Sequence, residues 1–169
     1  KESGTFDKTE NGKISRLWSA RIVQKDRNRL LAISAKNPEI DVYSLSGAYL
    51  YKMQIPQISP IQKRLQFANK LTQSDKNNVN TLVSYISDAV INDQLLYLLV
   101  NDQVTEDRVS CDIVEILKIE DNTLHLVKVL QLSPTDERGW YNSICVDSQN
   151  TILFAYNESS HSIEKYSLK

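Results

Sequence analysis

Glycine, cysteine and histidine are scarce in this sequence, and each shortage narrows the chemistry open to it. Only 4 glycines occur among 169 residues, and none stands in a glycine-rich phosphate-binding loop. Cys111 and Cys145 lack the spacing of metal ligands, and we do not expect them to form a disulfide. His125 and His161 have no neighbours in the pattern of a catalytic triad. We therefore predict no metal, no cofactor and no catalytic residue.

Long apolar runs and an excess of basic charge are missing as well. The longest apolar stretch, Leu95 to Val100, has the length of a strand and is too short to span a membrane. The 20 lysines and arginines nearly balance the 21 aspartates and glutamates, giving a net charge of -1, and the two signs are well mixed. Because no basic stripe stands out, we expect no nucleic-acid partner. Because the apolar stretches are short, we expect no membrane span.

The sequence does contain one short phrase that it uses three times. Residues 40–45 read Ile-Asp-Val-Tyr-Ser-Leu, residues 163–168 read Ile-Glu-Lys-Tyr-Ser-Leu, and a looser copy occupies 114–119. Self-similarity at such intervals indicates a repeat architecture. With a period of two, the first copy places Ile40 and Val42 on one face of a strand and apolar side chains on the other face too. Such a strand suits a sheet that stacks between two others.

The residues around each phrase repeat in the same order. A short strand, a polar turn and a stronger apolar strand precede it, and the spacing from Ile22 to Leu30 equals that from Ile144 to Ile152. A reversal and a fourth strand follow it at 48–55 and at 123–132. Four antiparallel strands per unit, with the innermost strand first, make the blade of a β-propeller. The sequence thus predicts an all-β fold of about three blades.

The predicted boundaries place blades at about 14–56, 84–133 and 138–169 within a single domain. The insertion at 57–83 contains apolar residues at helical spacing and Pro60 at a suitable helix start, so we expect a short helix at about 61–72. A polar loop is expected around 74–80.

The third unit ends after its phrase, without a fourth strand. The segment 12–17 is a candidate for that strand, as propellers often complete a blade in this way. Three blades fall below the usual range of four to eight, and an open arc exposes strand edges and sheet faces. We therefore expect a protein partner or a second copy to complete a six-bladed ring, unless the chain is half of a longer protein.

These blades resemble those of six-bladed propellers of the NHL/TolB-like group, especially those common in gut Bacteroidetes. The carriers of the resemblance are the strand pattern, the stretch Ile-Asp-Val-Tyr-Ser-Leu-Ser-Gly-Ala-Tyr-Leu at 40–50, and the ending at 162–168. They cover most of the chain apart from 57–83. The resemblance implies an extracytoplasmic, periplasmic or surface-anchored binding protein.

The loop that leads into the third blade is the best candidate for a ligand site. Arg138 offers a fork of donors for an anion, and Trp140 and Tyr141 offer faces on which a sugar or ring can stack. Arg16 and Trp18 occupy the corresponding place in the first blade. A packing role between blades explains the repeated tryptophan more simply than ligand contact does, and the ligand interpretation stays open beside it.

Three functions remain in competition. The first is a non-enzymatic binding module that requires a partner at its open edge. The second is a propeller hydrolase, lactonase or lyase, for which Asp93, Asp147, Asn101 and Asn157 are the only candidate ligands of a central metal. The third is a glycan-binding propeller that uses Trp140 and Tyr141, with carbohydrate as its ligand.

Overall fold

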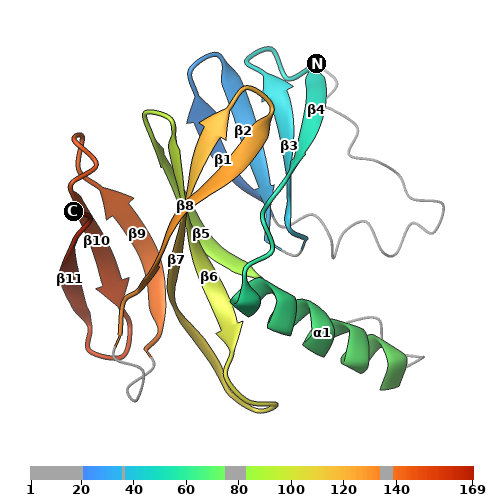
Figure 1. Ribbon diagram of the computed structural model, residues 1–169, viewed down its shortest axis with the longest axis vertical. Helices are drawn as coiled ribbons and strands as arrows, with labels where there is room; N and C mark the ends of the chain where they lie inside the picture. Colours follow the sequence, from blue (N-terminus) through green and yellow to red (C-terminus); the bar gives the residue numbers. More distant parts are fainter. Residues whose placement is uncertain (1–20, 36, 75–82, 134–138) are drawn as a thin grey trace.

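The computed structural model describes residues 21–35, 37–74, 83–133 and 139–169, and these ranges form eleven strands and one helix (Figure 1). The strands are β1 (Arg21–Asp26), β2 (Arg29–Ser34), β3 (Glu39–Ser44), β4 (Tyr49–Gln54), β5 (Ile86–Asn92), β6 (Leu95–Gln103), β7 (Val109–Glu120), β8 (Thr123–Gln131), β9 (Tyr141–Val146), β10 (Ile152–Asn157) and β11 (Ser162–Ser167). The helix is α1 (Ser59–Ser74). The predicted all-β fold with one short helical insertion is confirmed.

Hairpins connect the strands into three antiparallel sheets, which we call blades. Blade 1 has the order β1-β2-β3-β4, blade 2 has the order β5-β6-β7-β8, and blade 3 has the order β11-β10-β9. Two-residue turns close several hairpins and begin with a positive φ, at Arg27 (49°), Asp93 (56°) and Asp121 (50°). Positive φ is the geometry that tight hairpin turns favour, so these turns form here without glycine.

The three blades stand in a row, with blade 2 between the other two (Figure 1). Their first strands are neighbours, since β5 packs against both β1 and β9. One polar side chain ties each pair together: Gln24 donates to the carbonyl of Ala89 at 2.8 Å, and Asp88 accepts from the amide of Ile144 at 2.9 Å. The innermost strand therefore comes first in each blade, as predicted.

Each blade has two faces with different neighbours. We call the face toward the next blade in chain order the forward face and the opposite one the backward face. The forward face of blade 1 and the backward face of blade 2 share one core with α1, and the forward face of blade 2 and the backward face of blade 3 share another. The first core includes Leu31, Ile33, Ile40, Val42, Leu96, Leu98 and Leu117, and the second includes Tyr97, Leu99, Val114, Ile116, Tyr141, Leu153 and Ala155.

The register corrects one alignment drawn from the sequence. The equal spacing suggested that Leu30 corresponds to Ile152, but the pairing with the repeated phrase makes Leu153 its equivalent. The reason is the turn: two residues join β1 and β2, whereas in blade 3 four residues, 148–151, lie between Asp147 and Ile152, whose backbone hydrogen bond closes the β9–β10 hairpin. A shift of one residue moves every side chain of a strand to the other face.

Helix α1 lies at one end of blade 2 and packs on β6 (Figure 1). Ile61 is fully buried there, and Pro60 occupies the first turn, where a missing N–H costs nothing. Arg64 is 7% exposed, and its guanidinium donates to the carbonyl of Ser84 at 3.1 Å and to the Gln103 side chain. The helix thus extends the core along β6 instead of standing free.

The β6–β7 hairpin is longer than the sequence suggested. The strand-length apolar stretch of the sequence ends at Val100, but Asn101 and Asp102 also lie inside β6 and are 4% and 2% exposed. They pair with Cys111 and Ser110 of β7, and the α1 residues packed on β6 shield this end from water. The packing of α1 on β6 allows the strand to continue through these two polar residues, and their identity alone does not reveal it.

Blade 3 contains three strands in the described ranges, in agreement with the missing fourth strand of the sequence. The segment 12–17 and most of the polar loop at 74–80 lie outside the described residues. No helix among the described residues is both long and apolar enough to cross a membrane.

The acidic residue of the phrase occupies the same backward-face position in all three blades. Pairing places Asp41 opposite Ala32, Glu115 opposite Leu98 and Glu164 opposite Ala155. Glu115 is fully buried, and neither of its carboxylate oxygens has a hydrogen-bond partner among the described residues. Burial raises the pKa of Glu115 to about 8.

Glu164 in blade 3 has the hydrogen-bond donors that Glu115 in blade 2 lacks. Glu164 accepts hydrogen bonds from the hydroxyls of Tyr166 and Tyr141 and from Asn157. In blade 2 the corresponding positions hold apolar side chains. These are Leu117, Ile86 and Val100. An acid with donors lies in one blade, and an acid surrounded by hydrocarbon lies in the other.

The Glu115 carboxyl predicts a stability that falls as pH rises. Its pKa lies near 4.5 in the unfolded chain and near 8 in the folded one, so folding binds a proton between these values. The free energy of unfolding should therefore drop between about pH 5 and 8, by up to ~1.4 kcal/mol per pH unit, and level off above. Urea unfolding across this range should show Glu115→Gln with a weaker dependence. Glu120→Gln, exposed on the same strand, is the control, and parallel curves for Glu115→Gln and the parent would contradict the prediction.

Candidate functional site

The predicted ligand loop enters blade 3 through Trp140, which is 39% exposed. Its backbone bridges to Cys111 of β7, and its carbonyl accepts from the amide of Glu158 at 2.9 Å. The indole nitrogen donates to the Asn142 side chain at 2.8 Å. One face of an aromatic ring and one amide thus lie together at the surface, where the loop meets the innermost strand.

Tyr141 has a different environment from its neighbour. It is 1% exposed, and its ring packs edge-on against Tyr166, with centroids 6.5 Å apart. The hydroxyl donates to Glu164 at 2.8 Å and lies 2.9 Å from the Tyr166 hydroxyl. The hydrogen bonds from Tyr166 and Tyr141 hold the pKa of Glu164 below its usual value. In this conformation Tyr141 supports the inside of blade 3.

Asp112 anchors the base of the same loop. It is fully buried and accepts from the Ser133 hydroxyl at 2.8 Å and from the Gly139 amide at 3.3 Å. A side chain at Gly139 would begin 3.0 Å from both Ser133 and the Tyr141 ring, so the approach is close. The sequence analysis missed Asp112, although a carboxylate among the mostly apolar residues of β7 was a usable signal.

The other predicted site residues cannot be placed beside these. Arg16, Trp18 and Arg138 lie outside the described residues, as does the segment 134–138. The equivalence of the two tryptophans, and the alternative of ligand contact or blade packing, therefore stay predictions.

The candidate metal ligands are spread over different parts of the fold. Asn101 bonds to Ser84 and Ser87, and Asn157 bonds to Glu164. Asp147 accepts from Thr151 and from the amide of Ile152, and these bonds, Thr151 first, lower its pKa. Asp93 forms the β5–β6 turn. Within the described ranges, no group of three or more His, Cys, Asp or Glu side chains lies close enough to hold a metal ion.

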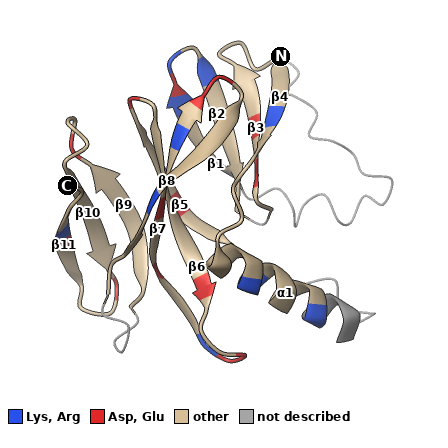
Figure 2. Cartoon of the chain, viewed as in Figure 1, with Lys and Arg blue, Asp and Glu red and all other residues tan. Residues whose placement is uncertain are grey.

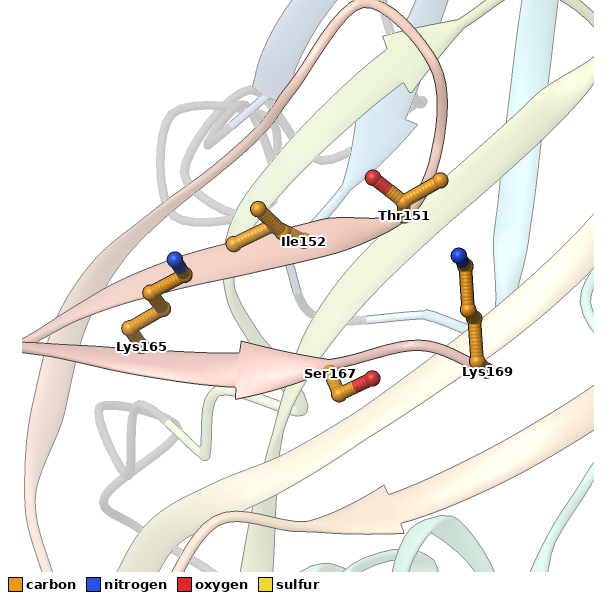
Figure 3. A pocket seen from close by; sticks show the side chains of 5 residues that line it. All are labelled: Thr151, Ile152, Lys165, Ser167 and Lys169. Carbon is orange, nitrogen blue, oxygen red and sulfur yellow. The ribbon is translucent and has the colours of Figure 1, made fainter.

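A shallow hollow lies on the forward face of blade 3 (Figure 3). Its volume is about 410 Å³, and its lining is Thr151, Ile152, Lys165, Ser167 and Lys169. Two ammonium groups, two hydroxyls and the side chain of Ile152 line it. The rest of the described surface carries both signs of charge, and Figure 2 shows no continuous basic stripe across the described blades.

Comparison with known proteins identifies the architecture. No family model matches the chain, and no curated protein matches it. The β-propeller domain of Cps50 (Swd1) from Myceliophteria thermophila matches 83% of this chain, with a TM-score of 0.51 and 11% identity. The chain folds as blades of a β-propeller.

Two further solved structures match the chain over a similar extent. A protein from Lactobacillus plantarum matches 88% of the chain with a TM-score of 0.56 and 10% identity. A provisionally assigned 6-phosphogluconolactonase of Bacteroides fragilis matches 89% with a TM-score of 0.52 and 13% identity. This chain covers 36%, 37% and 34% of the three solved chains, so it spans about a third of their length. At these identities the likeness shows the fold alone.

The hydrogen bonds that the tyrosine hydroxyls donate to Glu164 lead to a prediction about stability. Tyr166→Phe removes one donor from a carboxylate that lies between strands, and should lower the free energy of unfolding by about 1–2 kcal/mol. Tyr156→Phe is the matched control, because the Tyr156 hydroxyl makes one exposed contact, to His161, at the long distance of 3.4 Å. Equal losses in chemical denaturation for the two variants would count against a structural role of Glu164.

Proposed function

We propose that this chain is a non-enzymatic binding module that recognises protein through the end faces of its row of blades. The observation that carries the proposal is a difference in exposure at one position of the repeated phrase. Ile40, on the forward face of blade 1, is fully buried against blade 2, whereas Ile163, its equivalent on blade 3, is 73% exposed. The same kind of face is covered in one blade and open in the other.

The neighbouring positions of blade 3 support the same proposal. Phe154 and Tyr156 are the equivalents of Leu31 and Ile33, which are fully buried, but both remain partly exposed. Large apolar side chains gathered on one open face are typical of a surface that binds another protein.

The backward face of blade 1 is open in the same way. Tyr43 and Tyr49 pack edge-on with centroids 5.7 Å apart, and Tyr49 is 57% exposed. The equivalent of Tyr43 is Tyr166, which packs into the core between blades 2 and 3. A row of blades with two uncovered ends is suited to receive further sheets on both sides. A ring of six blades and an extracytoplasmic location belong to this proposal through the resemblance to NHL/TolB-like propellers.

Site-specific photo-cross-linking tests the proposal in the cells that make the protein. A photoreactive phenylalanine at Ile163 should give a covalent protein adduct, because that side chain points from the open forward face. The same group at Gln62, exposed on α1, is the matched control. If position 163 yields no more adduct than position 62, the forward face of blade 3 is not a protein-binding surface.

Trp140 favours glycan binding as a second candidate function. An exposed indole beside the amide of Asn142 offers a stacking face and a hydrogen-bonding group within one small area. The lactonase name of one structural neighbour gives no comparable support, because a likeness at 13% identity shows the fold alone.

The tryptophan provides the test of that candidate. Trp140→Ala should abolish binding on a glycan array while the free energy of unfolding changes by less than about 1 kcal/mol, because the ring is partly exposed. Asn142→Ala, which keeps the indole, should weaken binding without abolishing it. A large loss of stability in Trp140→Ala would instead assign the ring to packing between blades.

A further inference from the structure

We infer that β8, the outer strand of blade 2, accepts an extended segment of another protein as a fifth strand, and that this segment alternates acidic and apolar residues. Strand addition at a sheet edge is a recurrent way of binding a peptide, in which backbone hydrogen bonds give affinity and alternate side chains give specificity. This surface is separate from the end faces and does not depend on them. Blade 2 has a blade on each side, so its outer edge is not an end of the row (Figure 1).

The edge of β8 is long and has few of the features that prevent strand pairing. The strand has 9 residues, against 6 in β4, the outer strand of blade 1, and it pairs only with β7 among the described residues. Natural edge strands are commonly short, rich in charge or interrupted by proline. β8 contains one lysine, one histidine, no acid and no proline. A β-bulge leaves Val127 unpaired, and regular pairing with β7 continues on both sides of it.

One side of β8 is apolar and largely exposed. Its pairing with β7 places Leu126 and Val129 on the backward side of blade 2, where they are 47% and 44% exposed. Val127, at the bulge, is 56% exposed. Exposed apolar side chains gathered in one place are typical of a surface that binds another protein. A strand added beside β8 would cover Leu126 and Val129 with apolar side chains of its own, as neighbouring strands do on one face of a sheet.

The other side of β8 carries its two basic residues. Pairing with β7 places Lys128 and His125 on the forward side. His125 lies 3.5 Å from Glu120 of its own blade, whereas no carboxylate among the described residues forms an ion pair with Lys128. The outer strand of blade 1 differs, because its Lys52 lies 3.0 Å from Glu39 of the same blade. The ammonium group of Lys128 therefore favours a partner that supplies a carboxylate.

The two sides of β8 together define the chemistry of the partner. Side chains alternate between the faces of a strand, so a segment paired with β8 places every second residue on the side of Leu126 and Val129 and the others on the side of Lys128. Apolar residues fit the first set and acidic residues fit the second. A second copy of the chain does not meet this condition through β8, because that strand contains no acid to place beside Lys128.

Fluorescence anisotropy with the 169-residue chain and labelled synthetic peptides of the length of β8 tests the inference. A peptide of alternating glutamate and valine should bind, and one of alternating lysine and valine should bind about tenfold more weakly. Lys128→Glu should reverse this preference. Lys165→Glu makes the same change in net charge on blade 3, so it is the matched control and should leave both dissociation constants unchanged. Urea unfolding verifies that both variants fold, because both lysines are exposed.

Backbone methylation of the peptide distinguishes strand addition from simple charge attraction. N-methylation of every glutamate, or of every valine, removes the N–H groups along one edge of the peptide and keeps all its side chains. One of these two peptides should bind about 100-fold more weakly, because it loses the hydrogen bonds to β8, and the other should bind like the parent. Equal binding by the two methylated peptides, or no binding by the parent peptide of glutamate and valine, overturns the inference.

Discussion

The division of every blade into a forward and a backward face is the constraint on which the rest of the structure depends. A strand exposes alternate side chains on opposite sides, so a sheet held between two others must be apolar on both. Blade 2 meets this condition, since β6 buries Leu96 and Leu98 on one side and Tyr97 and Leu99 on the other. Blades 1 and 3 have the same alternation but a described neighbour on one side only. The position of a blade in the row, and not its own pattern, decides which residues are covered.

The acid of the phrase shows how one sequence position acquires three environments. Asp41 lies near Lys52 on the open face of blade 1, Glu164 accepts three hydrogen bonds in blade 3, and Glu115 is enclosed by hydrocarbon in blade 2. Hydrogen-bond donors and burial move the protonation equilibrium of a carboxyl group in opposite directions. The pKa of Glu164 falls and that of Glu115 rises because their neighbours differ, although their places in the blade are the same.

The sequence predicted the blades well because their information is local. The phrase containing Ile40 and Ile163 identified a strand in each blade, and the apolar spacing at 61–72 identified α1. It failed where distant contacts decide. The longer turn at 148–151 shifted the alignment of the second strands by one residue. The packing of α1 on β6 extended that strand through Asn101. The burial of Tyr141 depends on Glu164, 23 residues away, and the anchoring role of Asp112 depends on Ser133 and Gly139, so neither could be read from the loop sequence.

Polarity also explains why the ends, and not the loops, carry the strongest functional signal. A loop residue such as Trp140 has one exposed ring and one amide beside it, which sets a small contact area. An end face is a whole sheet whose side-chain pattern already matches a contact that the chain makes twice internally. Natural sheets limit association by placing charges on open surfaces. Here Lys165 interrupts an apolar forward face and Lys169 borders the same hollow, while Ile163 beside Lys165 stays 73% exposed. Charges within an apolar contact surface select among partners more than they repel them, because a partner with an acid at the facing position satisfies a lysine and a partner without one leaves it buried and unpaired.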